Sequence, residues 1–74
     1  MPEIEEFDAV ALREDLPEHG LLRGQMGTVV MVHTPHDYEV EFVDQEGYTY
    51  ALLQLSSDKL IRIHRHRPKD VDQI

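Results

Sequence analysis

The stretch Thr28-Val29-Val30-Met31-Val32-His33-Thr34-Pro35-His36-Asp37-Tyr38-Glu39-Val40-Glu41-Phe42-Val43 decides the fold class of this 74-residue chain. Residues 28–33 include four β-branched side chains, which favour a strand. The following Thr34-Pro35-His36-Asp37 is typical of a tight turn, because proline presets φ and aspartate suits turn positions. From residue 38 to 43 apolar side chains alternate with glutamates, as in a half-buried strand. The stretch therefore predicts a β-hairpin with one apolar face.

Alternation also assigns the two faces of the second strand in this hairpin. Tyr38, Val40 and Phe42 share one side, and we expect them to fill the interior of the domain. Glu39 and Glu41 share the other side, so we expect both carboxylates to face solvent.

Three more strands are expected around the hairpin, at residues 7–12, 48–55 and 60–63. A turn at residues 44–47 joins the hairpin to the second of these, with Gly47 where a positive φ is needed. One helical or 3₁₀ turn, with a serine as its N-cap, is expected just before the last strand. The predicted fold class is all-β: a small five-stranded SH3-like barrel with one 3₁₀ turn before the last strand. A four-stranded open sheet is the alternative.

A single domain is expected at residues 1–63, followed by a polar C-terminal tail at residues 64–74. There is no cysteine, which excludes disulfides and thiol chemistry. No apolar run approaches the roughly 20 residues of a membrane span, and the acidic N-terminus does not resemble a signal peptide. We therefore expect a cytoplasmic protein with no membrane partner.

Charge is unevenly distributed along the chain. Fifteen acidic residues against seven lysines and arginines give a net charge of −8. Acids dominate residues 3–18 and 37–46, whereas residues 59–69 hold five bases and no acid. Phosphate backbones and anionic lipids repel so acidic a chain, so we expect no nucleic-acid partner and a basic protein partner instead.

No catalytic, cofactor or metal site is expected from the residues. Ser56 and Ser57 fit the capping of a helical turn, and no nucleophile elbow surrounds them. His64 and His66 are two residues apart and would supply only half of a metal site, so whether they bind metal stays open. The sequence indicates a protein that is not an enzyme.

A contact surface is expected on the strand at residues 48–55. Alternation places Tyr48, Tyr50 and Leu52 on one side, and Ala51, Leu53 and Leu55 on the other, so both sides are apolar. A small barrel has only one interior. Tyrosine hydroxyls prefer a wet boundary, so we expect the tyrosines to lie outside. The predicted partner-binding residues, most of them aromatic or acidic, are Tyr48, Tyr50, Leu52, Glu39 and Glu41.

The chain resembles a family of small bacterial proteins known only as a domain of unknown function. The resemblance spans about residues 4 to 63 of the chain and is carried by residues 7–12, 15–21, 23–30, 38–44, Gly47 and 51–53. It implies an SH3-like barrel whose gene lies beside another small gene, in the manner of antitoxin or immunity partners. Gly24-x-x-Gly27-x-Val29 is also similar to a signature of barrels that bind RNA or ribosomal surfaces.

These observations favour a non-catalytic protein-binding module, antitoxin-like or immunity-like, whose partner is a neighbouring basic protein. Two alternatives stay open: a nucleic-acid or ribosome-associated barrel, and an accessory structural subunit of a larger enzyme. The identity of the partner and the oligomeric state, including a homo-oligomer, are not determined by the sequence.

Overall fold

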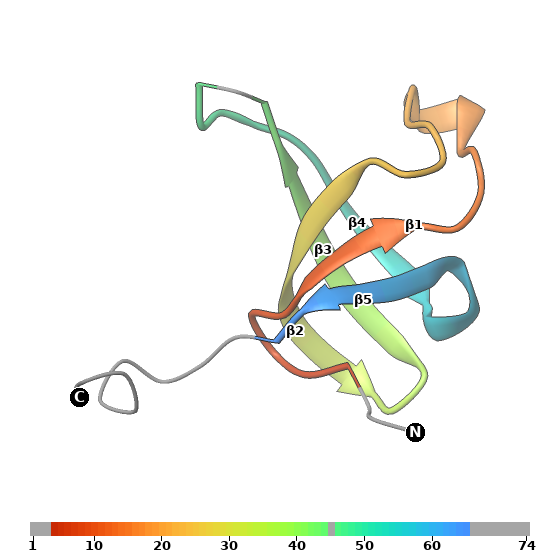
Figure 1. The fold of residues 1–74 in the computed structure, drawn as a ribbon, viewed down its shortest axis with the longest axis vertical. Helices are drawn as coiled ribbons and strands as arrows, with labels where there is room; N and C mark the ends of the chain where they lie inside the picture. The colour runs from red at the N-terminus through yellow and green to blue at the C-terminus, as the bar shows by residue number, and fades with distance from the viewer. Residues whose placement is uncertain (1–3, 45, 66–74) are drawn as a thin grey trace.

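In a computed structural model that describes residues 4–44 and 46–65, the chain forms one antiparallel five-stranded sheet. The strands are β1 (Ala9–Leu12), β2 (Met26–Thr34), β3 (Asp37–Val43), β4 (Thr49–Ser56) and β5 (Leu60–His64). They are hydrogen-bonded in the order β4-β3-β2-β1-β5, and the sheet curls so that β1 and β5 cover β3 and β4 (Figure 1). The predicted all-β fold is confirmed.

The barrel is approximate, because the sheet does not close. Among the described residues β4 and β5 stand at opposite ends of the strand order and are not paired with each other. Closure would have removed both edges. Among the described strands β4 instead pairs on one side only, with β3, which the expectation of a closed barrel had missed.

Two 3₁₀ turns complete the described fold. The expected one, η2 (Ser57–Lys59), lies between β4 and β5. Its N-cap is Ser56, whose side chain makes no bond to the backbone of the turn; instead the hydroxyl donates to the carboxylate of Asp58. A serine therefore occupies the N-cap position as expected, but its side chain makes no capping hydrogen bond. The other turn, η1 (Pro17–His19), lies in the first loop and was not predicted.

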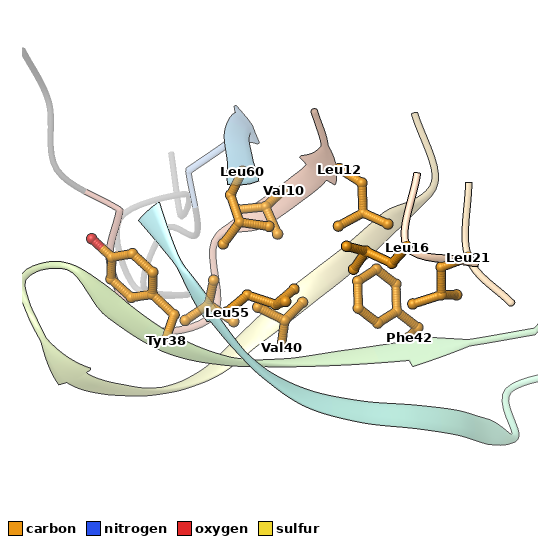
Figure 2. Close-up of a cluster of buried hydrophobic side chains, with 10 residues drawn as sticks. Val10, Leu12, Leu16, Leu21, Tyr38, Val40, Phe42, Leu55 and Leu60 are labelled. Carbon is orange, nitrogen blue, oxygen red and sulfur yellow. The ribbon is translucent and has the colours of Figure 1, made fainter. Parts of the chain in front are cut away.

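The predicted β2–β3 hairpin and its face assignment are confirmed. Thr34 pairs with Asp37 across the two-residue turn. Tyr38, Val40 and Phe42 are buried. They meet residues of β1 and β5 across the core, and Leu16 and Leu21 from the first loop close one end of it (Figure 2).

Gly27 explains how β2 can pass so close to β3. A Cβ at this position would lie 2.8 Å from Cγ1 of Val40 and 2.9 Å from the carbonyl oxygen of Glu41. Gly24, in the preceding loop, instead supplies a bend at φ 91° that favours glycine. The two glycines therefore have different roles. Gly24 allows the chain to bend, and Gly27 allows β2 to pack closely against β3.

The first strand begins two residues later than predicted, because residues 5–8 form a turn. Phe7 has a left-handed φ of 72°, and its N–H donates to the carbonyl of Val29. Asp8 is fully buried, and its Oδ2 accepts the N–H of Glu5 at 2.8 Å. The expected tail at residues 64–74 falls mostly outside the described residues; β5 itself runs to His64.

No helix in the described part of the chain is long and apolar enough to cross a membrane.

Candidate protein-contact surface

The candidate surface lies on the meander, which we define as β2, β3 and β4 with the turns that join them. Residues 24–58, which contain the meander, include no lysine or arginine. The same residues carry six acids, namely Asp37, Glu39, Glu41, Asp44, Glu46 and Asp58. Every lysine and arginine of the chain lies before or after this segment. The meander is therefore a long acidic part of the chain without lysine or arginine.

Large apolar side chains are exposed on the meander beside these acids. The predicted residues Tyr48, Tyr50 and Leu52 are all exposed. They are joined by other exposed apolar residues of the meander: Met26, Met31, Val32 and Val43. Among the described residues, seven of the eleven large apolar side chains that are exposed lie on the meander; the others are Phe7, Leu22, Ile61 and Ile63. Exposed apolar area is typical of a contact surface.

The register between β3 and β4 shows how Leu52 comes to lie outside. Leu52 is directly opposite Glu41, whose neighbours Val40 and Phe42 point into the core. Directly opposite residues share a face of the sheet. Leu52 and Glu41 therefore lie together on the outer face, an acidic and an apolar side chain next to each other.

Strict alternation along β4 fails at Tyr50. Val43 pairs with Thr49 and Phe42 pairs with Ala51, so Tyr50 is an extra residue at a bulge. Tyr50 is nonetheless about half exposed, at 47%. Its hydroxyl accepts a hydrogen bond from Nε2 of Gln25 at 2.8 Å, which ties β4 to the end of the first loop. Tyr50 is therefore exposed as alternation predicted, although it lies at a bulge.

The two predicted glutamates are only half exposed, because each has a partner. Oε1 of Glu39 lies 3.0 Å from Nε2 of His33, across the β2–β3 pair. Oε2 of Glu41 accepts the hydroxyl of Thr49 at 2.5 Å, across the β3–β4 pair. Both carboxylates are therefore held in place on the outer face, where a cationic side chain can reach them.

The basic residues near the C-terminus form a different environment. Arg62 turns inward from β5, and its NH1 lies 3.9 Å from Oδ2 of the buried Asp8. Nζ of Lys59 donates to Oε2 of Glu14 at 2.8 Å, and this bond raises the pKa of the lysine. Two of the five predicted bases are thus paired within the chain. Arg67 and Lys69 lie outside the described residues.

Asp8 is the residue that the sequence reasoning missed. It stands in what looks like the start of a strand, beside the two glutamates of an exposed acidic segment. The available signal was its position two residues before Val10. Residues two apart on a strand point to the same face, here the inner one.

Metal ligands do not gather in the described part of the chain. Within residues 4–44 and 46–65 no three histidine, aspartate or glutamate side chains are arranged to hold a metal ion. His64 ends β5, whereas His66 lies outside the described residues.

These features define a small all-β module with an acidic and apolar outer surface. Residues 6–62 match the model of a family described as a domain of unknown function, DUF4926. The chain belongs to this family, and the predicted resemblance is confirmed. Neither the curated proteins nor the solved structures compared with the chain show a significant match.

Proposed function

We propose that this protein is a non-catalytic binding module whose meander recognises a basic protein. The observation that carries the proposal is the composition of that surface: exposed apolar residues among five acids, with no lysine or arginine. Complementary charge steers association and excludes wrong partners, while exposed apolar side chains supply the anchors that become buried.

The concrete form of the proposal is an antitoxin-like or immunity-like partner of a basic protein encoded by a neighbouring gene. An acidic module that covers a cationic surface would inhibit any protein whose own target is anionic, such as a nucleic acid. The module needs no chemistry of its own for this role, and its action is binding alone in the cytoplasm.

A nucleic-acid role receives less support from the described residues. The loop that resembles RNA-binding barrels contains one base, Arg23. Lys59 and Arg62 are paired with carboxylates of the same chain. Phosphate recognition needs several unpaired cations on one face. An accessory role in a larger enzyme has no observation in its favour.

The test is capture of a partner from cells that produce the protein. The immobilised 74-residue chain is exposed to lysate at low and at higher salt, and the bound proteins are identified by mass spectrometry. We expect one basic protein, encoded beside this chain, whose retention falls as salt rises.

Two charge-matched variants locate the binding surface. Glu41→Lys and Glu18→Lys change the net charge equally, but only Glu41 lies on the meander. We expect Glu41→Lys to weaken capture about tenfold or more and Glu18→Lys to weaken it less than about threefold. Equal losses would mean that net charge alone drives binding. Capture of nucleic acid, or of a second copy only, would contradict the proposal.

A further inference from the structure

The two edges of the open sheet are built differently. β4 is eight residues long and has no charged residue and no proline. β5 is five residues long, contains Arg62, and is flanked by Lys59 and Arg65. Short length and basic side chains are the usual protection of an edge strand against pairing. β5 has this protection and β4 does not (Figure 1).

Both faces of β4 offer apolar surface that a neighbouring strand would cover. On the outer face Leu52 is 52% exposed. On the inner face Ala51 and Leu53 pair with Phe42 and Val40, yet both stay only partly buried. They are half-covered because β5 does not pair with β4 to close the barrel. A strand added at this edge would make cross-strand contacts on both faces.

Acids lie at both ends of the uncharged edge. Asp44 and Glu46 precede β4 in the turn, and Asp58 follows it in η2. Oδ1 of Asp44 accepts the backbone N–H groups of Glu46 and Tyr48, and Oδ1 of Asp58 accepts the hydroxyl of Ser56, whereas Glu46 is exposed. The edge is therefore apolar in its centre and has carboxylates at both ends, with Lys59 directly after Asp58.

We propose that β4 is extended by a sixth strand: an extended segment of the basic partner, apolar in its centre and carrying lysine or arginine at both ends. This deepens, and rests on, the proposed function. Main-chain hydrogen bonds to the free side of β4 provide the affinity. The basic ends pair with the acids at the ends of β4 and set its register. A second copy of this chain lacks such a segment among its described strands, because β5 has only one base within it.

The experiment measures backbone amide exchange in the intact 74-residue protein with a synthetic peptide as probe. The probe has a Val-Thr-Val-Thr-Val centre and a Lys-Arg pair at each end. We expect it to slow exchange of amides in β4 about tenfold or more, because a new strand protects the free edge. Exchange in β5 is expected to stay unchanged.

Two control peptides separate strand addition from simple charge attraction. One replaces each Lys-Arg pair by Glu-Glu, and the other replaces both threonines by proline, which removes two main-chain donors and keeps the charge. Neither is expected to protect β4. Equal binding by the proline peptide would overturn strand addition, although a cation-binding meander would still stand.

Matched variants test the two edges directly. Leu52→Lys lies on the β4 edge strand and Ile61→Lys on the β5 edge strand, and the two side chains are similarly exposed, at 52% and 49%. Leu52→Lys is expected to weaken probe binding about tenfold, and Ile61→Lys less than about twofold. Protection of β5, or of no strand at millimolar probe, overturns this proposal. The proposed function is decided separately, by whether the basic protein is captured through the meander.

Discussion

The meander and the β1–β5 pair share one core but differ in how they use charge. On the β1–β5 side the charged groups satisfy each other: Asp8 faces Arg62, and Glu14 binds Lys59. Among the described residues, the meander acids that have partners contact histidine, hydroxyl or backbone groups, and no lysine or arginine occurs between residues 24 and 58. On the β1–β5 side two carboxylates are paired with cations of the same chain. The carboxylates of the meander can instead pair with cationic side chains of a partner.

The largest expected effect comes from placing a charge on the inner face of the meander. Val40→Asp should unfold the domain, because an unpaired carboxylate in the core costs several kcal/mol, comparable to the whole stability of about 5 kcal/mol for a small domain. Glu41→Lys, one residue along on the outer face, should change the free energy of unfolding by about 0.5 kcal/mol or less. Far-ultraviolet circular dichroism in a urea titration measures both. Similar behaviour of the two variants would mean that the faces of β3 are wrongly assigned.

The next effect concerns the β1–β5 side. Asp8→Ala removes a buried carboxylate that faces Arg62 and accepts the N–H of Glu5, and should cost about 3 kcal/mol. Glu6→Ala removes an equal charge from the exposed turn and should cost less than about 0.5 kcal/mol. Chemical denaturation of the three proteins compares them. Equal stabilities would show that the Asp8–Arg62 pair does not hold the N-terminal turn to β5.

A smaller effect is expected at the outer surface. Tyr50→Ala removes an exposed ring and one hydrogen bond from Gln25, so the loss of stability should stay near 1 kcal/mol. Partner capture should fall much more, because Tyr50 lies on the proposed contact surface. Ala51→Asp, at the inward-facing neighbour, should instead damage the fold. If Tyr50→Ala melts as early as Ala51→Asp, the ring is part of the core and the contact surface loses an anchor.

The smallest effect lies where the two halves join. The hydroxyl of Ser56 donates to Asp58 and lowers the pKa of that carboxyl from its ordinary value of 3.8. A carboxyl with a lowered folded pKa stabilises the fold above its unfolded pKa, and that contribution is lost as the pH falls through the folded pKa. Ser56→Ala should therefore melt slightly below the wild type at neutral pH. The difference should shrink as the pH falls through the folded pKa, which lies below 3.8, and a difference that stays constant as the carboxyl protonates would rule out this linkage.

The fold was largely predictable because its signals are local. The β2–β3 hairpin follows from β-branched residues, a proline turn and a strict alternation, and each of these acts over a few neighbouring residues. The openness of the sheet was not predictable in this way. It depends on whether β4 and β5, which are joined through η2, pair with each other. A local sequence pattern does not predict such pairing.

The candidate surface was partly predictable for the same reason. Exposure of Tyr50 and Leu52 follows from alternation, whereas the bulge at Tyr50 appears only in the pairing of Thr49 with Val43. Asp8 was missed because its partner, Arg62, is 54 residues away in the chain. A local sequence pattern does not predict long-range ion pairs of this kind.

The most direct test of the account is a map of amide exchange for the whole protein, free and bound to the basic protein that it captures. The account predicts protection along the meander, greatest in β4, with β1 and β5 exchanging as in the free protein. Protection confined to β1 and β5, with the meander unchanged, would contradict it, because the partner would then contact the half whose charges are already paired.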